Sequence, residues 1–224
     1  MPFKFPFADR FFPPARGPAG EATLPPDVAD DLRRYVREYV RAGFLPAEDI
    51  PAQAADVLLG EADAAVLLKA AEGYLAQEVA AHAAEQVDWP AVTDCDRLDA
   101  AFAALEAAGV VCRQNFSCCG NCGVAEIGAE MDGAAAAGKR IRGYAFYHMQ
   151  DTESAVDGYG LCLNYGPRWE EGLTDADYAP RATAIGREVA AALADAGLAV
   201  DWDGSLNRRI SVTLDWKRRQ PATA

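Results

Sequence analysis

The sequence has no long hydrophobic run and no apolar leader at its N-terminus. No apolar stretch reaches the roughly 18 residues that a membrane-spanning helix needs, and residues 1–10 interrupt their phenylalanines with proline, lysine, aspartate and arginine. We therefore expect a protein that is neither exported by a signal peptide nor embedded in a membrane, and we place it in the cytoplasm.

The sequence also has few basic residues relative to its acidic residues. The chain carries 21 lysine and arginine residues against 34 aspartate and glutamate residues, which gives a formal net charge of -13 at pH 7. Such a chain repels phosphate backbones, whose neutralisation supplies most non-specific affinity for nucleic acid. We therefore expect no nucleic-acid partner, and we expect the basic run at residues 217–219 to be a solvated tail.

Several sequence motifs that would indicate a particular enzymatic activity are missing. The sequence has no glycine-rich phosphate loop, no serine nucleophile elbow and no paired-histidine metal motif. Its 224 residues, 51% hydrophobic and 25% charged, have the composition of a globular protein whose core needs no disulfide. Six cysteines without a signal peptide indicate a reducing compartment, where clustered thiols more often bind metal or carry redox chemistry. The sequence leaves open whether the protein is an enzyme.

Residues 1–25 form a phenylalanine- and proline-rich segment that cannot be a regular helix. We expect this segment to run extended over the surface. Its phenylalanines either pack on the protein's own body or dock on a protein partner or a second copy of the chain.

Residues 26–92 predict a helical region. Asp27 is the expected N-cap of a first helix, and Gly43 is the expected C-terminal stop. Two further helices are predicted near residues 52–59 and 63–87. The apolar stripe expected on the last of these helices consists of Leu68, Leu75 and Val79.

Residues 93–217 predict an α+β region. After a short helix, the pattern is strand, helix, strand, strand, helix, strand, with a possible final strand, which matches a split βαβ-like (βαββαβ) layer packed on helices. An acidic turn is expected at residues 151–158, and a thioredoxin-like core is the competing topology. The expected strands lie at residues 110–116, 141–149, 159–165, 198–202 and 208–214.

The feature that most clearly indicates a chemical function is a cluster of three cysteines, Cys118, Cys119 and Cys122, between a predicted strand and a predicted helix. A helix N-terminus favours thiolates, and residues three or four apart in a helix share one side, so the three sulfurs can converge. Sulfur ligands at this spacing suit tetrahedral zinc, and His148 is the candidate fourth ligand. The parallel strands would bring four further candidates to the same sheet edge: Asn115, Gln150, Asp151 and Glu153.

Two other interpretations of the cysteine cluster stay open. Cys119 and Cys122 enclose two residues at the start of a helix, which is where a thiol-disulfide oxidoreductase or a redox sensor would carry its reactive pair. Alternatively, the cysteines only pack a strand-to-helix corner in a non-enzymatic interaction protein.

The segments around the cluster also carry a family resemblance. The chain resembles an uncharacterised bacterial family, a domain of unknown function, in the run Arg-Gln-Asn-Phe-Ser-Cys-Cys-Gly-Asn-Cys-Gly at residues 113–123 and the run Gly-Tyr-Ala-Phe-Tyr-His-Met-Gln-Asp-Thr-Glu at residues 143–153. The similarity extends from Trp89 to about Trp216. It implies no established activity or cofactor. A histidine often follows the Cys-Gly pair in that family, where this chain has Val124, so the resemblance implies one candidate metal ligand fewer here.

Overall fold

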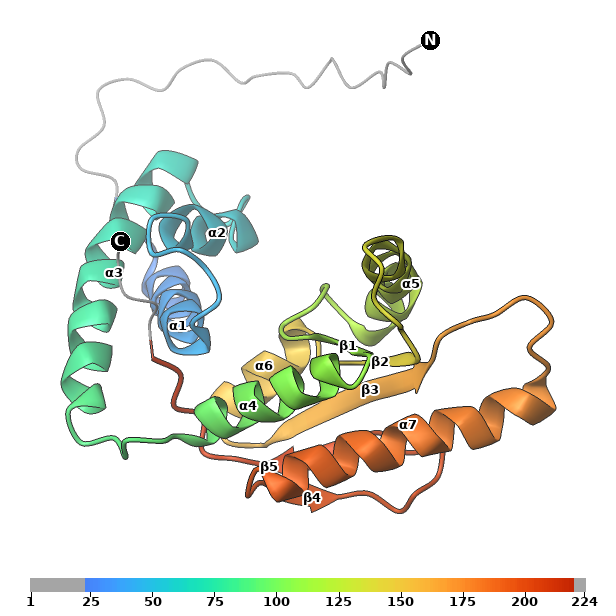
Figure 1. The fold of residues 1–224 in the computed structure, drawn as a ribbon. Coiled ribbons are helices and arrows are strands. Elements are labelled where there is room, and N and C mark those ends of the chain that lie inside the picture. The colour runs from blue at the N-terminus through green and yellow to red at the C-terminus, as the bar shows by residue number, and fades with distance from the viewer. Residues whose placement is uncertain (1–22, 220–224) are drawn as a thin grey trace, which may run out of the picture.

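The structure, a computed structural model, describes residues 23–219. The predicted docking segment at residues 1–25 therefore falls almost entirely outside the described residues. Three helices come first in the chain, and a five-stranded mixed sheet with four more helices follows (Figure 1). The predicted α+β class, with helices at the N-terminal end, is confirmed. None of the helices in residues 23–219 combines the length and the apolarity that crossing a bilayer requires.

The helical part consists of α1 (Pro26–Ala42), α2 (Ile50–Val57) and α3 (Ala64–Gln86). Helix α1 begins two residues earlier than predicted, with Pro25 at the N-cap and Asp27 in the first turn, because proline at the first helical position loses no hydrogen bond. Gly43 ends α1 with a left-handed φ of 73°. The three helices share a hydrophobic core of their own, which includes Leu32, Val36, Val40, Ile50, Ala54, Leu67 and Ala71.

The apolar stripe predicted on α3 is wrong. Leu68 and Val79 are exposed, and the residues that α3 buries include Glu78 and His82. The reason lies on α1, where Arg33 and Arg37 both donate to the Glu78 carboxylate. An ion pair across two helices allows a charged residue on the packed face, which hydrophobic periodicity does not reveal.

The sheet has the strand order β1-β2-β3-β5-β4. Strands β1 and β2 are parallel neighbours, and every other pairing is antiparallel. The first βαβ unit is therefore not split by an intervening strand. The elements are α4 (Asp94–Ala107), β1 (Val110–Arg113), α5 (Gly120–Ala136), β2 (Gly143–Phe146), α6 (Met149–Val156), β3 (Leu161–Pro167), α7 (Asp175–Asp195), β4 (Ala199–Asp201) and β5 (Ile210–Thr213).

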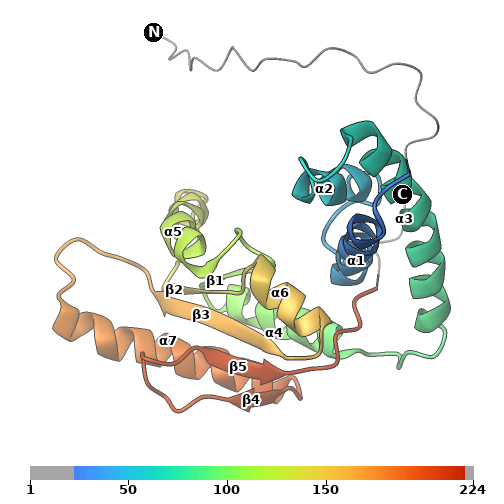
Figure 2. The ribbon, with the colours of Figure 1, turned by 180° about the vertical axis from the view of Figure 1, so that it is seen from behind.

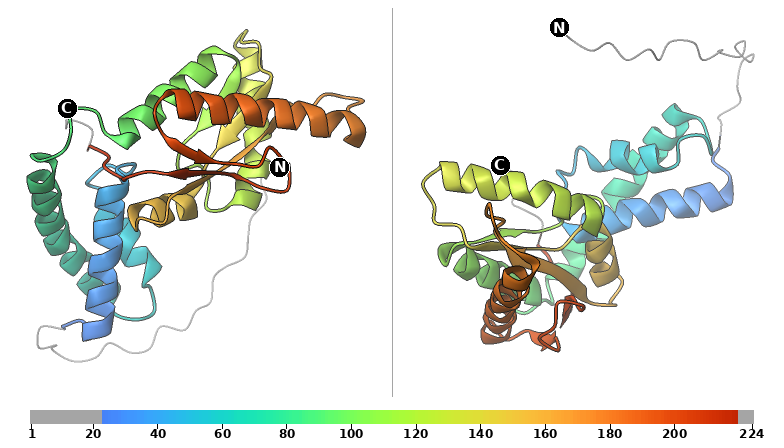
Figure 3. Two further views of the ribbon diagram at one scale, coloured as in Figure 1. Left: turned by 90° about the horizontal axis from the view of Figure 1, so that it is seen from below. Right: turned by 90° about the vertical axis from the view of Figure 1, so that its right-hand side faces the viewer.

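The two faces of the sheet bury different helices (Figures 2 and 3). Val110, Cys112 and Ala145 point toward α4 and α7, where the largest core lies. Val111 and Phe146, which alternate with them, point toward α5 and pack against Ile127 and Met131. This alternation along β1 and β2 places α5, and the cysteines at its start, over the face opposite α4 and α7.

One predicted turn is a helix. Residues 149–156 form α6 and not the expected acidic turn, because His148 caps the helix and Asp151 completes the capping box. Helix α6 contacts α1 on one side and β3 on the other. It therefore stands where the helical part meets the sheet.

The residues after β5 join the two parts of the molecule. Arg218 donates to Asp99 on α4 and lies over the Phe44 ring, and its carbonyl oxygen is 3.1 Å from Nε2 of His82 on α3. Trp216 donates from Nε1 to the carbonyl of Arg41 at 3.0 Å. The basic run at 217–219, expected to be a solvated tail, is in part a buried connection.

Candidate metal centre

The cysteine cluster begins in the loop that leaves β1. Asn115 and Ser117 have left-handed φ values of 50° and 61°, which few residues other than glycine adopt. Two backbone hydrogen bonds hold this loop to the continuation of β2: Phe116 donates to Tyr147 at 2.9 Å, and Met149 donates to Ser117 at 3.1 Å. The parallel pairing of β1 and β2 thus brings the segment before Cys118 next to the segment around His148, because the C-terminal ends of the two strands lie at the same edge of the sheet.

Two glycines let α5 approach the sheet closely. A Cβ atom on Gly123 would lie 2.4 Å from Cε2 of Phe146, a ring that is fully buried. A Cβ atom on Gly120 would lie 3.6 Å from Nε2 of His148. The first turn of α5 therefore rests on Phe146 and His148, and the cysteines stand on its outer side.

The three thiols of the cluster converge. Cys118, Cys119 and Cys122 are all free, and their sulfur atoms lie within 4.8 Å of one another. Cys118 is exposed and the other two are half-buried. Within residues 23–219 this is the one group of three or more histidine, cysteine or acidic side chains that is close enough to hold a metal ion.

The helix terminus and the neighbouring thiols set the acidity of the cluster. The Cys119 side chain makes no regular capping hydrogen bond, yet the backbone N–H and the thiol of Cys122, and then the N–H of Asn121, lower the pKa of the Cys119 thiol. Hydrogen bonding to Cys118 and Cys119 raises the pKa of Cys122 to about 11. One thiolate forms readily, and a second one beside it is opposed by the first.

His148 faces its own helix. Its Nδ1 accepts from the Asp151 N–H at 3.3 Å, and its Nε2 lies 3.1 Å from Oδ2 of Asp151. Burial lowers the pKa of His148, and Arg209 adds to this effect against the opposing charge of Asp151. The imidazole is thus neutral at pH 7 with both nitrogens engaged, so it would have to turn away from Asp151 to reach a metal ion.

Asp151 has a partner that the sequence analysis missed. The buried Asp151 carboxylate accepts from the guanidinium of Arg209, which also donates to the carbonyl of Cys162. Nε of Arg209 and Nδ2 of Asn164 are buried and have no hydrogen-bond partner among the described residues. No sequence signal ties Arg209 to Asp151, since 58 positions separate them and the contact depends on the pairing of β3 with β5.

The other predicted site residues separate into two groups. Asn115 and Glu153 line a pocket on the α1 side of α6, away from the thiols. Gln150 is exposed on α6. Val124, in the position where the resemblance leads one to expect a histidine, is exposed on α5, two residues after Cys122. The structure therefore gathers the three cysteines, sets His148 and Asp151 beneath them, and leaves three of the predicted edge residues elsewhere.

Comparison with known proteins returns one match. A family model described as a domain of unknown function, DUF6891, matches residues 25–220. No curated protein and no solved structure matches the chain.

Proposed function

The chain belongs to the DUF6891 family, a domain of unknown function, and we propose that Cys118, Cys119 and Cys122 bind a thiophilic metal ion, most readily zinc. The observation that carries the proposal is the convergence of three free sulfur atoms within 4.8 Å of one another. Zinc–sulfur bonds of about 2.3 Å in a tetrahedron put sulfur atoms about 3.8 Å apart, so small side-chain adjustments bring the cluster to that geometry.

The charge balance of the cluster also supports a cation. Each metal-bound cysteine is a thiolate, and three thiolates around Zn²⁺ leave one net negative charge. The N-terminus of α5 stabilises that charge through its dipole and its free N–H groups. Without a cation, the raised pKa of Cys122 keeps a proton on the cluster. Metal binding therefore releases protons that the thiols otherwise share.

We propose that the fourth metal position is taken by water or by a ligand from outside the chain. His148 as the fourth ligand stays a prediction, and its two contacts with Asp151 speak against it. Three protein ligands with one open position are the pattern of zinc sites that act on a bound molecule, whereas structural zinc sites are usually closed by four protein ligands. The half-exposed cluster leaves such a position accessible.

The test is the metal content of untagged protein, measured by elemental mass spectrometry together with a thiol count after denaturation. We expect about one zinc ion per chain. Replacing Cys118, Cys119 or Cys122 by serine should remove it. The matched control is Cys162→Ser, a half-buried cysteine outside the cluster, which should keep it. A wild-type protein that holds no metal and still has six free thiols would overturn the proposal.

A second function is favoured by the position of Cys119 at the N-cap of α5, with its sulfur within 4.8 Å of the Cys122 sulfur. The Cys119 thiolate at the helix N-terminus can attack a disulfide of a substrate, which forms a mixed disulfide and releases one substrate thiolate. Cys122 then attacks the Cys119 sulfur, which forms the Cys119–Cys122 disulfide and releases the second substrate thiolate. This sequence leaves Cys119 and Cys122 oxidised and the substrate reduced by two electrons. Metal-free protein with two of its six thiols missing from the count would favour this function over metal binding.

A further inference from the structure

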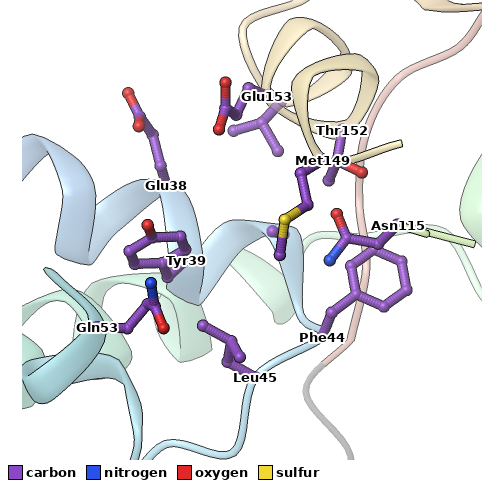
Figure 4. A pocket seen from close by; sticks show the side chains of 11 residues that line it. Glu38, Tyr39, Phe44, Leu45, Gln53, Asn115, Met149, Thr152 and Glu153 are labelled. Carbon is purple, nitrogen blue, oxygen red and sulfur yellow. The ribbon is translucent and has the colours of Figure 1, made fainter. Parts of the chain in front are cut away.

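A pocket with a volume of about 110 Å³ lies between the helical part and the sheet part of the molecule. Its walls come from four separate stretches: α1, the turn and helix that follow it, the loop after β1, and α6 (Figure 4). The cysteines do not line it. The pocket is therefore a second site, and an inference about it does not depend on the metal centre.

The inner part of the pocket is apolar. Phe44 and Leu45 form one wall after the end of α1, and Met149 faces them from the first turn of α6. The guanidinium carbon of Arg218 lies 4.7 Å from the centre of the Phe44 ring, a cation–π contact with this wall. An apolar pocket with a few convergent polar groups is the usual form of a small-molecule site.

Two carboxylates stand on one side of the pocket. Figure 4 shows the carboxylates of Glu38 from α1 and Glu153 from α6 on the same side of the pocket. Glu38 is held by Arg34, whose guanidinium lies 3.0 Å from Oε1, while Glu153 forms no ion pair with any residue in 23–219. Burial first, and then the charge of Glu38, raises the pKa of Glu153, while the charge of Arg34 opposes this shift, so the rim holds two carboxylates against one guanidinium. The rim therefore has an excess of negative charge that a bound cation would relieve.

Neutral polar groups complete the rim. Burial raises the pKa of the Tyr39 hydroxyl, so it stays protonated and offers an oxygen acceptor. The amides of Gln53 and Asn115 offer two further carbonyl oxygens. Among residues 23–219, no lysine, arginine or histidine lines the pocket. Its polar groups thus favour a donor-rich cation and disfavour an anion.

We propose that this pocket binds a small primary amine, with its apolar chain between Phe44, Leu45 and Met149 and its ammonium group between Glu38 and Glu153. The volume fixes the size of the chain. An apolar cavity of about 150 Å³ holds a benzene molecule, so about 110 Å³ holds about four carbon atoms. The probe that matches both requirements is n-butylammonium.

The experiment is a titration of the full isotope-labelled chain with n-butylammonium, followed by NMR chemical shifts of the pocket residues. Butyrate and 1-butanol are the matched probes, with a similar chain and a negative or a neutral head group. We expect butylammonium to bind with an affinity on the order of millimolar and the other two to bind at least about tenfold more weakly.

Single variants identify the groups that select the charge. Glu153→Gln and Glu38→Gln should each weaken butylammonium binding about three- to tenfold. Glu72→Gln makes the same change in net charge at an exposed position of α3 away from the pocket and should leave binding unchanged. Butylammonium, butanol and butyrate binding equally well would overturn the proposal. So would an absence of shifts in the wild-type pocket, or a loss of binding in Glu72→Gln as large as in Glu153→Gln.

Discussion

His148 and Asp151 cap each other at the start of α6, with Nε2 of His148 3.1 Å from Oδ2 of Asp151 and the His148 N–H donating to the same oxygen. The start of α6 therefore lies next to the cysteine cluster, and another side of the helix lines the pocket. His148 supports the first turn of α5 through Gly120, and Met149 and Glu153 face the pocket. The helix that was predicted to be a turn therefore lies between the cysteine cluster and the pocket.

The first prediction concerns Asp151. Its side chain is 8% exposed and contacts both His148 and Arg209, so Asp151→Asn leaves the partly exposed Arg209 guanidinium without its counter-charge. We expect a loss of about 2 kcal/mol in the free energy of unfolding. Urea unfolding of metal-free, reduced protein measures it.

Asp157→Asn is the matched control for this variant, because Asp157 is exposed at the other end of α6. It should change the free energy of unfolding by less than about 0.5 kcal/mol. Equal changes in the free energy of unfolding for the two variants would show that Asp151 stabilises the fold no more than an exposed aspartate does.

The second prediction compares two glycines of α5. Gly123→Ala places a methyl group 2.4 Å from the buried Phe146 ring, and we expect it to lower the free energy of unfolding by about 2 kcal/mol. Gly128→Ala meets nothing within 4 Å and should raise it by about 0.5–1 kcal/mol, because alanine favours the helix. Thermal or urea unfolding of both variants measures these two changes in the free energy of unfolding. If Gly123→Ala were the more stable of the two, the close packing of α5 on β2 would be refuted.

The third prediction is the order in which the cysteines react with iodoacetamide in metal-free protein. Cys119 should react first at pH 7, since its pKa is lowered by the N–H groups at the start of α5. Cys95 and Cys112 should react last, because burial raises their pKa values to about 11 and about 12. Peptide mass spectrometry gives the order, and the unfolded chain, in which the differences should vanish, is the control. Cys119 reacting no faster than Cys162 would contradict the site geometry.

The fourth prediction concerns acid stability. Burial lowers the pKa of His82 below 6.5, so the unfolded chain binds a proton that the folded chain does not. The contribution to stability is complete above pH 6.5 and is lost as the pH falls from 6.5 toward the folded pKa, at no more than about 1.4 kcal/mol per pH unit. The unfolding free energy of His82→Gln, measured with a chelator and a reductant between about pH 7.5 and about pH 5.5, should change less with pH than that of wild type. An identical slope would be evidence against this role.

The sequence predicted those features that depend on local rules. Helix α4 begins where Thr93 and Asp96 form a capping box, and α3 begins after Asp63, which accepts from two backbone N–H groups. The convergence of the cysteines follows from strand-to-helix spacing alone. The position of His148 near the cluster follows from the parallel pairing of β1 and β2.

The features that were missed depend on contacts between distant segments. The burial of Glu78 requires Arg33 and Arg37 from another helix, and the Asp151–Arg209 pair requires β3 and β5 to be neighbours. The extent of α6 and its N-cap were not predicted, because the helix is short and begins at a histidine, which is not among the usual capping residues. The pocket has no sequence signature, since its walls come from four stretches that only the fold brings together.

The most direct test of the central claim is X-ray absorption at the zinc edge of the metal-loaded full chain, which counts the sulfur atoms bound to the metal. The proposal predicts three sulfur neighbours at about 2.3 Å and one oxygen or nitrogen neighbour at about 2.0–2.1 Å. His148→Gln should leave this spectrum unchanged, since both ring nitrogens of His148 already contact Asp151. A first shell without sulfur would contradict the claim that Cys118, Cys119 and Cys122 form a metal centre.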